Sequence, residues 1–523
     1  MIVYGALVGP DDFGSRSSAI FLRIPAEALV AAVVLLVLPA RARKVAAVAG
    51  GLFLGLLVLL KFVDIGFALA FDRPFDLVLD WILLGPAVGM LAESVGRAGA
   101  IGTVFGAVLL VAAALVLATW SVLRLTRLMV GHRSAAIRVV ALLAAAWVGC
   151  AAFGAQIVPG VPVASRSTAA LIGDRVEQVG AGLRDKQAFA EQAAADPFRD
   201  VPSSRLLTGL RGKDVVLTFV ESYGRNAIQD PESAPQVGAV LDAGTRRLRA
   251  AGFGARSGYL QSSTTGGGSW LAHATLQSGL WVTNQRRFRA LVSSDRLTLT
   301  GAFGRAGWRT VAVEPAISGA WPESGFYGYD QTYTTQNLGY RGPRLSYATM
   351  PDQYTFAAFE RSEHGLPGRP PLMAQITLVS SHSPWTPLPR SVDWDAVGDG
   401  SIFSGPAGEQ GDSADTAWTS GTSRIRAAYR QSMEYSLGTV ISYVERYGDD
   451  DLVLVFLGDH QPAPIVTGPG RGRDVPITIV ARDRRVLERI SGWGWTEGLK
   501  PGPRAPVWRM DAFRDRFLTA FGR

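Results

Sequence analysis

Three ionisable residues stand directly after two apolar runs of this 523-residue sequence. The run VVLTFV is followed by Glu221, and the run VLVFLG by Asp459 and His460. Short runs rich in β-branched and apolar residues predict strands that are buried on both faces of a sheet. In open α/β sheets, ligands bind just outside the carboxyl ends of the strands. Two carboxylates and an imidazole that meet there could hold a divalent transition metal.

A fourth candidate is Ser269, which follows the glycine run Gly266–Gly268. We expect a helix over Ser269–Ser278, because no breaker interrupts it and Gly279 stands just past its end. Backbone N–H groups at a helix start favour an anion and depress the pKa of a hydroxyl. A serine that only caps the helix would give the same pattern, so both interpretations stay open.

The elements that must position these residues are further apolar runs and helical segments. Strands are expected over Trp308–Pro315, Ala374–Ser380 and Val475–Arg482, with a helical segment over Ala427–Tyr447. Strands that alternate with helices predict an α/β sheet with helices on both faces. His382 follows its strand by two residues, so we expect it at the same edge of the sheet as the candidates above.

The first third of the chain has the pattern of a membrane region. Hydrophobic residues make up 48% of the sequence and charged residues 18%, and the apolar excess lies before about Pro159. A spanning helix needs ~20 apolar residues. Four segments reach this length alone or with their flanks: Ile24–Ala40, Val45–Leu60, Ala98–Leu123 and Val139–Ser165. Phe75–Val95 is broken by Pro86, and we expect it at the membrane interface, with a re-entrant or fifth span as the alternative.

Basic residues between the apolar segments give the orientation. The first two segments are separated by Arg41, Arg43 and Lys44, and the last two by Arg124, Arg127, Arg133 and Arg138. Loops rich in Lys and Arg stay in the cytoplasm, so we expect a multi-pass protein of the cell membrane whose later part is extracytoplasmic. The net charge of +8 fits loops that face an anionic leaflet. No stretch interleaves basic and aromatic residues, so no nucleic-acid partner is expected.

Composition divides the chain into three parts. We predict a transmembrane region over 1–163 with about four spans, a helical linker over 164–204 and a catalytic domain over 205–523. The linker is polar and alanine-rich, with charges spaced as on a solvated helix. The single cysteine, Cys150, lies in an apolar run, so there is no disulfide framework.

Four motifs together resemble the sulfatase-type alkaline phosphatase superfamily: FVESYGR, GGGSW, SSHSPW and LGDHQP. Within it they are similar to the membrane-anchored phosphoglycerol transferase and lipoteichoic acid synthase branch. The resemblance covers roughly Lys213–Arg482 by motifs. It implies an N-terminal α-helical transmembrane region followed by an α/β sulfatase-like domain, whose mixed sheet has helices on both faces.

The family's single metal site maps onto four positions of this sequence: Glu221, Ser269, Asp459 and His460. The ion is usually manganese, with magnesium and zinc as alternatives. Ser269 takes the place of the usual threonine nucleophile, and the neighbouring Thr264 and Thr265 are fallback candidates. His382 matches the histidine that binds the transferring group or protonates the leaving one.

Four further residues are candidates for contact with substrate: Arg225, Trp270, His273 and Asp330. Arg225 and Trp270 lie within the motifs and could stabilise charge on phosphoryl oxygens. His273 lies one helical turn after the candidate nucleophile, and packing is the alternative role. Asp330 closes the stretch FYGYD, which resembles a substrate-pocket stretch of the family.

The resemblance therefore implies a metal-dependent phosphotransferase. Ser269 would attack a phosphodiester and carry a covalent phospho-serine intermediate. The expected donor is a membrane lipid such as phosphatidylglycerol, and the acceptor a glycolipid, polymer or glycan of the cell envelope. The alternative is a sulfatase-like hydrolase, either a phosphodiesterase or a sulfuric ester hydrolase, with the same metal site. The third hypothesis is a catalytically inactive scaffold with the same fold. A formylglycine sulfatase is not expected, because the C-x-P-x-R signature is absent.

Overall fold

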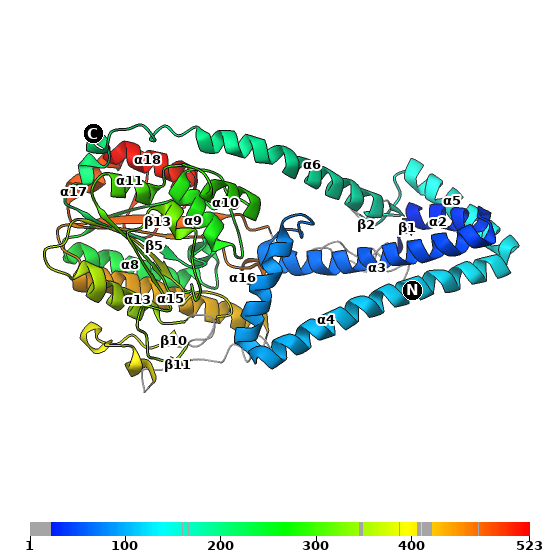
Figure 1. Cartoon of the computed structure of the whole chain (residues 1–523), viewed down its shortest axis with the longest axis horizontal. Coiled ribbons are helices and arrows are strands. Elements are labelled where there is room, and N and C mark those ends of the chain that lie inside the picture. The colour runs from blue at the N-terminus through cyan, green and yellow to red at the C-terminus, as the bar shows by residue number, and fades with distance from the viewer. Residues whose placement is uncertain are drawn as a thin grey trace. The chain divides into compact units, whose positions relative to one another are not determined.

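This computed structural model describes residues 22–158, 161–165, 167–344, 349–385, 388–404, 409–410, 421–468 and 470–522. Residues 1–21 of the predicted membrane region lie outside the described residues. The chain divides into two compact units, seen in Figure 1. The first unit comprises Met1–Leu69 and Arg73–Asp185, and the second comprises Ala70–Asp72 and Lys186–Arg523. The division falls within the linker predicted over 164–204.

Helices make up most of the first unit: α2 (Ala26–Val37), α3 (Ala40–Phe71), α4 (Leu84–Gly131), α5 (Arg133–Ala152) and the first part of α6 (Ser167–Ala194). Of the described residues, three helices are long and apolar enough to cross a membrane: Ala40–Phe71, Gly96–Gly131 and Arg133–Ala152. Four spans were expected. The first expected span forms α2, whose 12 residues give ~18 Å of helix against ~30 Å of hydrocarbon.

The break expected at Pro86 and the loop expected at Arg41–Lys44 both lie within helices of the membrane region. Pro86 does not break its segment, because it is the third residue of α4, where no intrahelical bond needs its missing N–H. The helix instead changes direction at Gly96, which has φ of 78°. The basic residues Arg41, Arg43 and Lys44 lie in the first turns of α3 rather than in a loop.

Four short strands complete the first unit. β1 (Ile24–Pro25) pairs with β4 (Ala164–Ser165), and β2 (Gln156–Val158) pairs with β3 (Val161–Pro162). The span expected over Val139–Ser165 is therefore shorter, because α5 ends at Ala152 and the chain continues into these strands.

A buried ion pair joins α6 to α3 within the first unit. Nη2 of Arg175 lies 2.5 Å from Oδ2 of Asp64, and both side chains are at least nine-tenths buried. Nη1 of Arg175 donates to the carbonyl of Phe75, whose N–H donates to Oδ1 of Asp64. Charged side chains in apolar helices are tolerated when they are paired. The beginning of α6 is therefore a packed part of this unit.

A nine-stranded mixed sheet forms the centre of the second unit. Its order is β14-β6-β13-β12-β5-β9-β7-β8, and β15 pairs with β6. The neighbours from β12 to β8 run parallel, whereas β13 is antiparallel to both β12 and β6. The strands are β5 (Asp214–Val220), β6 (Gly254–Gln261), β7 (Arg309–Glu314), β8 (Gln331–Thr334), β9 (Leu372–Leu378), β12 (Leu452–Gly458), β13 (Asp474–Ala481), β14 (Thr496–Glu497) and β15 (Val507–Arg509).

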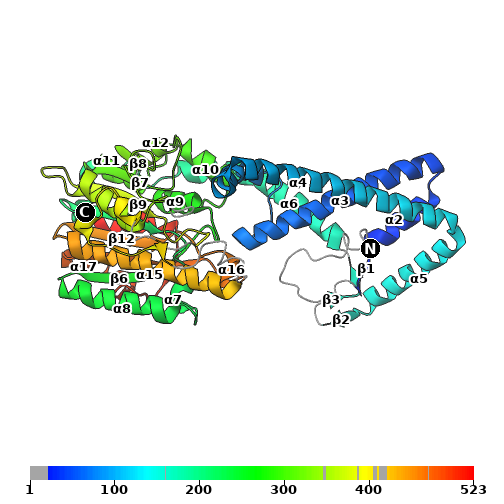
Figure 2. The same ribbon diagram turned by 90° about the horizontal axis from the view of Figure 1, so that it is seen from below.

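Helices cover both faces of this sheet, as predicted. Figure 1 shows α8, α13 and α15 on one face, and α9, α11, α17 and α18 on the other. Figure 2 shows α8 and α15 side by side. The helices are α7 (Asn226–Gln229), α8 (Ala234–Ala250), α9 (Ser269–Ser278), α10 (Gln285–Val292), α11 (Leu299–Arg305), α12 (Ser324–Tyr327), α13 (Asp352–Phe359), α15 (Thr422–Tyr447), α16 (Pro464–Thr467), α17 (Arg484–Arg489) and α18 (Ala512–Phe521). A short pair, β10 (Leu388–Pro389) and β11 (Glu409–Gln410), lies apart from the sheet.

The apolar runs form strands because both of their faces are buried. In β5, Val216 and Val220 pack with α8 and α15, whereas Leu217 and Phe219 pack with α9 and α18. Each such side chain contributes ~1.5–3 kcal/mol when it is removed from water. The two cores fix which side chains of each strand face which helix layer, and the parallel pairing of β5 with β12 brings their carboxyl ends side by side.

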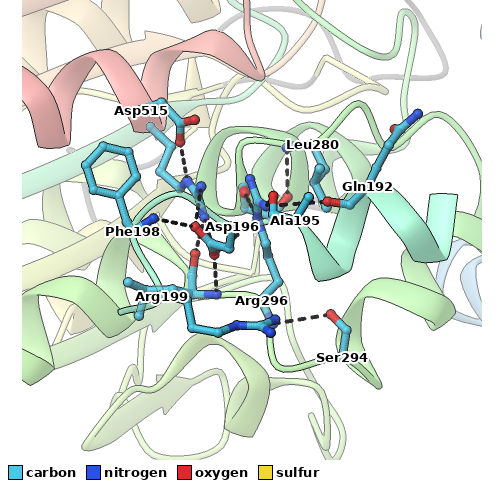
Figure 3. A network of polar contacts seen from close by, with 12 residues as sticks. Gln192, Ala195, Asp196, Phe198, Arg199, Leu280, Ser294, Arg296 and Asp515 are labelled. Carbon is cyan, nitrogen blue, oxygen red and sulfur yellow. Dashed lines mark hydrogen bonds and ion pairs between the residues drawn. The ribbon is translucent and has the colours of Figure 1, made fainter. Parts of the chain in front are cut away.

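A buried ion network ties the chain just after α6 to the rest of the second unit (Figure 3). The carboxylate of Asp196 accepts hydrogen bonds from Arg514 at 3.0 and 3.1 Å and lies 3.4 Å from Nε of Arg296. The side chains of Asp196 and Arg514 are fully buried. Arg296 also donates to the carbonyls of Ala195 and Ser278, at 2.6 and 2.9 Å. Arg296 thereby links the residue that follows α6 to the last residue of α9.

Candidate metal centre and nucleophile

The candidate metal ligands come from two neighbouring parallel strands. β5 and β12 pair in register from Asp214 opposite Leu452 to Val220 opposite Gly458. Glu221 therefore follows β5 at the point where Asp459 follows β12. The strand runs that suggested this neighbourhood are confirmed as strands, and their ends meet as expected.

The side chains after these strands form a compact buried cluster. One ligand atom each of Glu221, Asp459 and His460 lies within 4.8 Å of the others, and all three residues are buried. Nε2 of His460 is 3.2 Å from Oε1 of Glu221 and 3.5 Å from Oδ2 of Asp459. Two carboxyl groups thus face one imidazole nitrogen.

Main-chain hydrogen bonds fix the orientation of two of the candidate ligands, His460 and Asp459. Nδ1 of His460 lies 2.8 Å from the carbonyl oxygen of Gln461. A carbonyl only accepts, so Nδ1 carries the proton and Nε2 faces the carboxylates. Oδ1 of Asp459 accepts from the N–H groups of Ser222 and His460, both at 2.8 Å. Its Oδ2 is left to face the cluster.

The electrostatics of the cluster show excess negative charge. Burial lowers the pKa of the His460 imidazole, but Asp459 and Glu221 outweigh it and raise that pKa to about 9. Burial, and then the charge of Glu221, raise the pKa of Asp459 to about 7. Burial opposes ionisation of Glu221 too, but the positive charges of His382 and His460 hold its pKa well below its usual range. The protonated Nε2 of His460 therefore lies where the two carboxylates stabilise a positive charge.

The residues fit a divalent metal ion on two observations. Oδ2 of Asp459 is buried and has no hydrogen-bond partner within the described part of the chain. A buried carboxylate oxygen without a donor is costly unless a cation or proton is bound to it. The donor set of carboxylate, imidazole and hydroxyl is one that manganese, magnesium or zinc can accept, and it does not select among them.

Ser269 lies against this cluster at the start of α9. Its Oγ donates to Oε2 of Glu221 at 2.9 Å and lies 3.2 Å from Nε2 of His460. The predicted helix over Ser269–Ser278 is confirmed, and Gly279 ends it in a left-handed conformation. Gly268 occupies the N-cap position, so Ser269 is not the capping residue.

Two residues beside the candidate ligands, Ser222 and Gly458, are constrained by their close surroundings. Ser222 has φ of 58°, which is uncommon for a side chain other than glycine, and its hydroxyl donates to Oε1 of Glu221 at 3.1 Å. Gly458 stands where a Cβ atom would lie 1.8 Å from the carbonyl oxygen of Tyr223. Only glycine lets the ends of β5 and β12 come this close.

His382 lies on a turn that is bonded to the cluster. The turn Val379–His382 follows β9, and the N–H of His382 donates to the carbonyl of Val379 at 3.0 Å. The hydroxyl of Ser381 donates to the main-chain oxygen of Glu221 at 2.7 Å. The His382 side chain is partly exposed, and its charge acts on Glu221. It therefore combines solvent access with a position near the cluster.

His273 and Trp270 flank Ser269 on α9. The ring of His273 stacks on Phe219 with centroids 3.8 Å apart, and its buried Nε2 has no hydrogen-bond partner within the described residues. Burial lowers the pKa of His273 to about 3, so it is neutral at physiological pH. Trp270 is 38% exposed and donates from Nε1 to Gln285. His273 therefore packs against Phe219, and Trp270 presents an aromatic surface next to Ser269.

Two expected substrate contacts receive no support from their positions. The guanidinium of Arg225 is bonded to Asp474 at 2.9 Å, and it stacks over the ring of Tyr259. The carboxylate of Asp330 accepts from the N–H and hydroxyl of Thr310, the second residue of β7. Asp330 is therefore at the amino end of a parallel strand, opposite the edge where the ligands lie. Both motifs were matched by sequence, which does not report side-chain partners.

Sequence reasoning missed the residues that hold the ligands. Ser222 and Ser381 lie within the motifs FVESYGR and SSHSPW, where a hydroxyl next to a candidate site residue was the only signal available. Asp352, described below, lies in no motif, and its partners are 27 and more residues away. The fallback candidates Thr264 and Thr265 are buried, and Oγ1 of Thr264 has no hydrogen-bond partner within the described chain. Of these three candidate nucleophiles, Ser269 is the one whose hydroxyl is hydrogen-bonded to the cluster.

No protein-family model matches the sequence, and no curated protein matches it. Solved structures similar to this chain include the lipoteichoic acid synthase LtaP from Listeria monocytogenes, at 15% identity and a TM-score of 0.37 over 52% of this chain and 66% of that chain. The chain thus spans just under two thirds of the length of LtaP. The phosphoglycerol transferase GacH from Streptococcus pyogenes, in complex with sn-glycerol-1-phosphate, is 14% identical with a TM-score of 0.37, over 63% of this chain and 78% of that chain.

A third similar structure is the C-terminal periplasmic domain of EcEptC from Escherichia coli. It is 13% identical with a TM-score of 0.39, over 59% of this chain and 82% of that chain. Another is described as a protein of the alkaline phosphatase superfamily from Vibrio parahaemolyticus. The chain is thus similar to structures of the kind that the motifs predicted. At these identities and TM-scores the likeness assigns no activity to this chain, whose fold is given by its own strands and helices.

Proposed function

We propose that this chain is a membrane-anchored, metal-dependent phosphotransferase that moves a phosphoglycerol group from a lipid to an acceptor of the cell envelope. The observation that carries the proposal is the position of Ser269. Its hydroxyl is 2.9 Å from Glu221 and 3.2 Å from His460, at the first residue of a helix. A nucleophile bonded to a carboxylate at a helix N-terminus is suited to phosphoryl transfer.

Four residues would hold the metal ion, namely Glu221, Ser269, Asp459 and His460. When bound, a manganese ion would supply positive charge that lowers the pKa of the Ser269 hydroxyl and neutralises phosphoryl oxygens. Magnesium and zinc are the alternatives. Glu221 orients the Ser269 hydroxyl and accepts its hydrogen bond.

The transfer itself takes two steps on Ser269. Oγ of Ser269 passes its proton to Oε2 of Glu221 and attacks phosphorus in line, so that an Oγ–P bond forms and the P–O bond to diacylglycerol breaks. His382 gives a proton to the departing alcohol oxygen. An acceptor hydroxyl then attacks the phospho-serine and loses its proton to His382, and the released Oγ of Ser269 takes its proton back from Glu221. The partial exposure of His382 would allow this exchange with two successive substrates.

The membrane region supports a lipid donor. Three described helices are long and apolar enough to span a bilayer, so the second unit would remain near lipid head groups. We place the second unit outside the cytoplasm on the charge of the segments between the spans. The acceptor would be a glycolipid, polymer or glycan at that surface, and Trp270 offers an exposed aromatic face for a sugar or glycerol moiety.

The test uses the full-length protein in detergent with manganese and a fluorescent phosphatidylglycerol. We expect diacylglycerol, together with a glycerophosphate adduct on the peptide that contains Ser269. Ser269→Ala should abolish both products, whereas the matched control Thr264→Ala, five residues away, should retain them. Cleavage of a generic aryl phosphate or sulfate that needs Ser269, without turnover of the lipid, would exclude this donor and favour the hydrolase. An adduct on Thr264 would refute the assignment of the nucleophile.

A further inference from the structure

Asp352 is a fully buried carboxylate that the proposed chemistry does not use. It is the first residue of α13, on the face of the sheet that also carries α15. Within the described part of the chain it forms no ion pair. Burial raises its pKa above the usual range, although several hydrogen bonds oppose the shift. A carboxylate buried without a cation is costly, so its hydrogen bonds must compensate for the lost hydration.

The hydrogen bonds of Asp352 converge on the turn that follows β9. Oδ1 accepts from the N–H of Val379 and from the N–H of Ser380, both at 2.9 Å. The N–H of Asp352 donates in return to Oγ of Ser380 at 3.0 Å. Oδ2 accepts from the hydroxyl of Ser436 on α15 at 2.5 Å. One side chain therefore fixes two consecutive peptide groups of the turn to two helices.

The same turn carries groups that act in the candidate site. Its Ser381 hydroxyl bonds to the main chain of Glu221 at 2.7 Å, and the N–H of Glu221 donates to Leu378 at 3.1 Å. Its last residue is His382. A change in the path of Val379 and Ser380 would thus move a metal ligand and the candidate proton donor together.

We propose that Asp352 is a positioning residue, which holds the turn Val379–His382 and so sets where His382 and Glu221 stand. The proposal rests on the proposed function of the site. Asp352 itself touches neither the reacting atoms nor the metal ligands' side chains. Groups hydrogen-bonded directly to metal ligands change metal affinity or activity by about 10–100-fold when they are removed, and Asp352 reaches Glu221 through the turn and its Ser381 hydroxyl.

A matched control, Asp214, lies at the opposite end of β9 from Asp352. Asp214 is also a buried carboxylate, and its Oδ1 accepts from the N–H of Leu372, the first residue of β9, at 2.8 Å. It is paired with Arg369 at 2.6 Å. Asp214→Ala therefore removes a buried carboxylate from the amino end of β9, and Asp352→Ala removes one from the carboxyl end. Loss of stability alone would be common to both variants.

The experiment compares Asp352→Ala, Asp352→Asn and Asp214→Ala in the full-length protein. We expect Asp352→Ala to speed hydrogen exchange at Val379 and Ser380 by about tenfold or more, as for loss of a hydrogen bond. Manganese affinity, measured by calorimetry, and kcat should fall by about 10–100-fold, with a smaller change in KM. Asp352→Asn keeps one oxygen for both N–H groups, so it should retain most of the wild-type values. Asp214→Ala should leave exchange at this turn and manganese affinity unchanged.

Equal manganese affinity and kcat in Asp352→Ala and Asp214→Ala would overturn the proposal. If Asp352→Ala does not fold, Ser381→Ala provides the second test, because it breaks the bond from the turn to Glu221 and leaves Asp352 in place. Unchanged manganese affinity in that variant would also overturn the proposal. Exchange and manganese binding need no substrate, so they test the role of Asp352 even if the proposed lipid donor is wrong.

Discussion

Asp196→Ala should destabilise the second unit by ~3–5 kcal/mol, the loss observed when one partner of a buried ion pair is removed. Asp196 and Arg514 are fully buried, and Arg296 is 3% exposed. Removal of the carboxylate leaves two guanidinium groups without their buried counter-charge. At ~2 °C per kcal/mol for a large domain, the melting temperature should fall by ~6–10 °C.

The control for this variant is an ion pair of the same second unit at its surface. Lys500 and Asp242 are 2.6 Å apart, with side chains 38% and 48% exposed. Exposed pairs of this kind contribute ~0–1 kcal/mol, so Asp242→Ala should lower the melting temperature by no more than ~2 °C. A shift for Asp196→Ala no larger than for Asp242→Ala would refute the reasoning that the buried charges are mutually required.

The dependence on pH gives a second readout for Asp196. Burial opposes its ionisation, but hydrogen bonds and the charges of Arg514 hold its pKa below the usual 3.8. A group with a lowered folded-state pKa stabilises the fold above its unfolded pKa and ceases to do so as pH falls through the folded value. The stability gap between wild type and Asp196→Asn should therefore be constant above about pH 5 and close in stronger acid. A gap that widened on acidification would contradict the assignment.

The remaining predictions concern the candidate site and the boundary of the second unit. Gly458→Ala should abolish the rise in melting temperature caused by manganese, because its Cβ would lie 1.8 Å from the carbonyl oxygen of Tyr223 and displace the loop that carries two ligands. Manganese affinity should increase from about pH 6 to 9, because the pKa values of Asp459 and His460 are raised to about 7 and about 9 and both groups must lose a proton to bind the ion. Calorimetry in buffers of different ionisation enthalpy should detect the released protons. A fragment over 186–523 should be more stable than one over 204–523, which lacks Asp196; equal melting temperatures would contradict this.

The sequence was informative where the signal is local. The position of Glu221 and of Asp459 at strand ends depends only on the apolar runs before them, and both runs form strands. The helix that begins at Ser269 has its predicted bounds because glycine residues stand on both sides of it. These local signals were sufficient to predict the candidate ligands at the strand ends and an α/β sheet with helices on both faces, whereas the mixed sheet was expected from the family resemblance.

The sequence was uninformative where a role depends on distant partners. Asp196 and Arg514 are 318 residues apart, and no pattern at either position reports that they meet. Arg225 stands in a motif, but its bond to Asp474 arises from packing of the whole sheet. The apolar segment that forms α2 has the composition of a span, and only the structure shows that its helix ends after 12 residues. In each case tertiary contacts decide the outcome.

The hydrogen bonds between the loops of the candidate site also bear on how such a protein can change over time. Ser381 bonds to Glu221, Ser222 to Asp459, and Gly266 to Gln461. These hydrogen bonds tie the loops that bear the candidate ligands and the candidate nucleophile to one another. Because a longer loop adds little to the entropy of closure, the segments that run outward from these bonds can lengthen or diverge while the chemistry is kept. A new acceptor could be accommodated in those segments without any change at the strand ends.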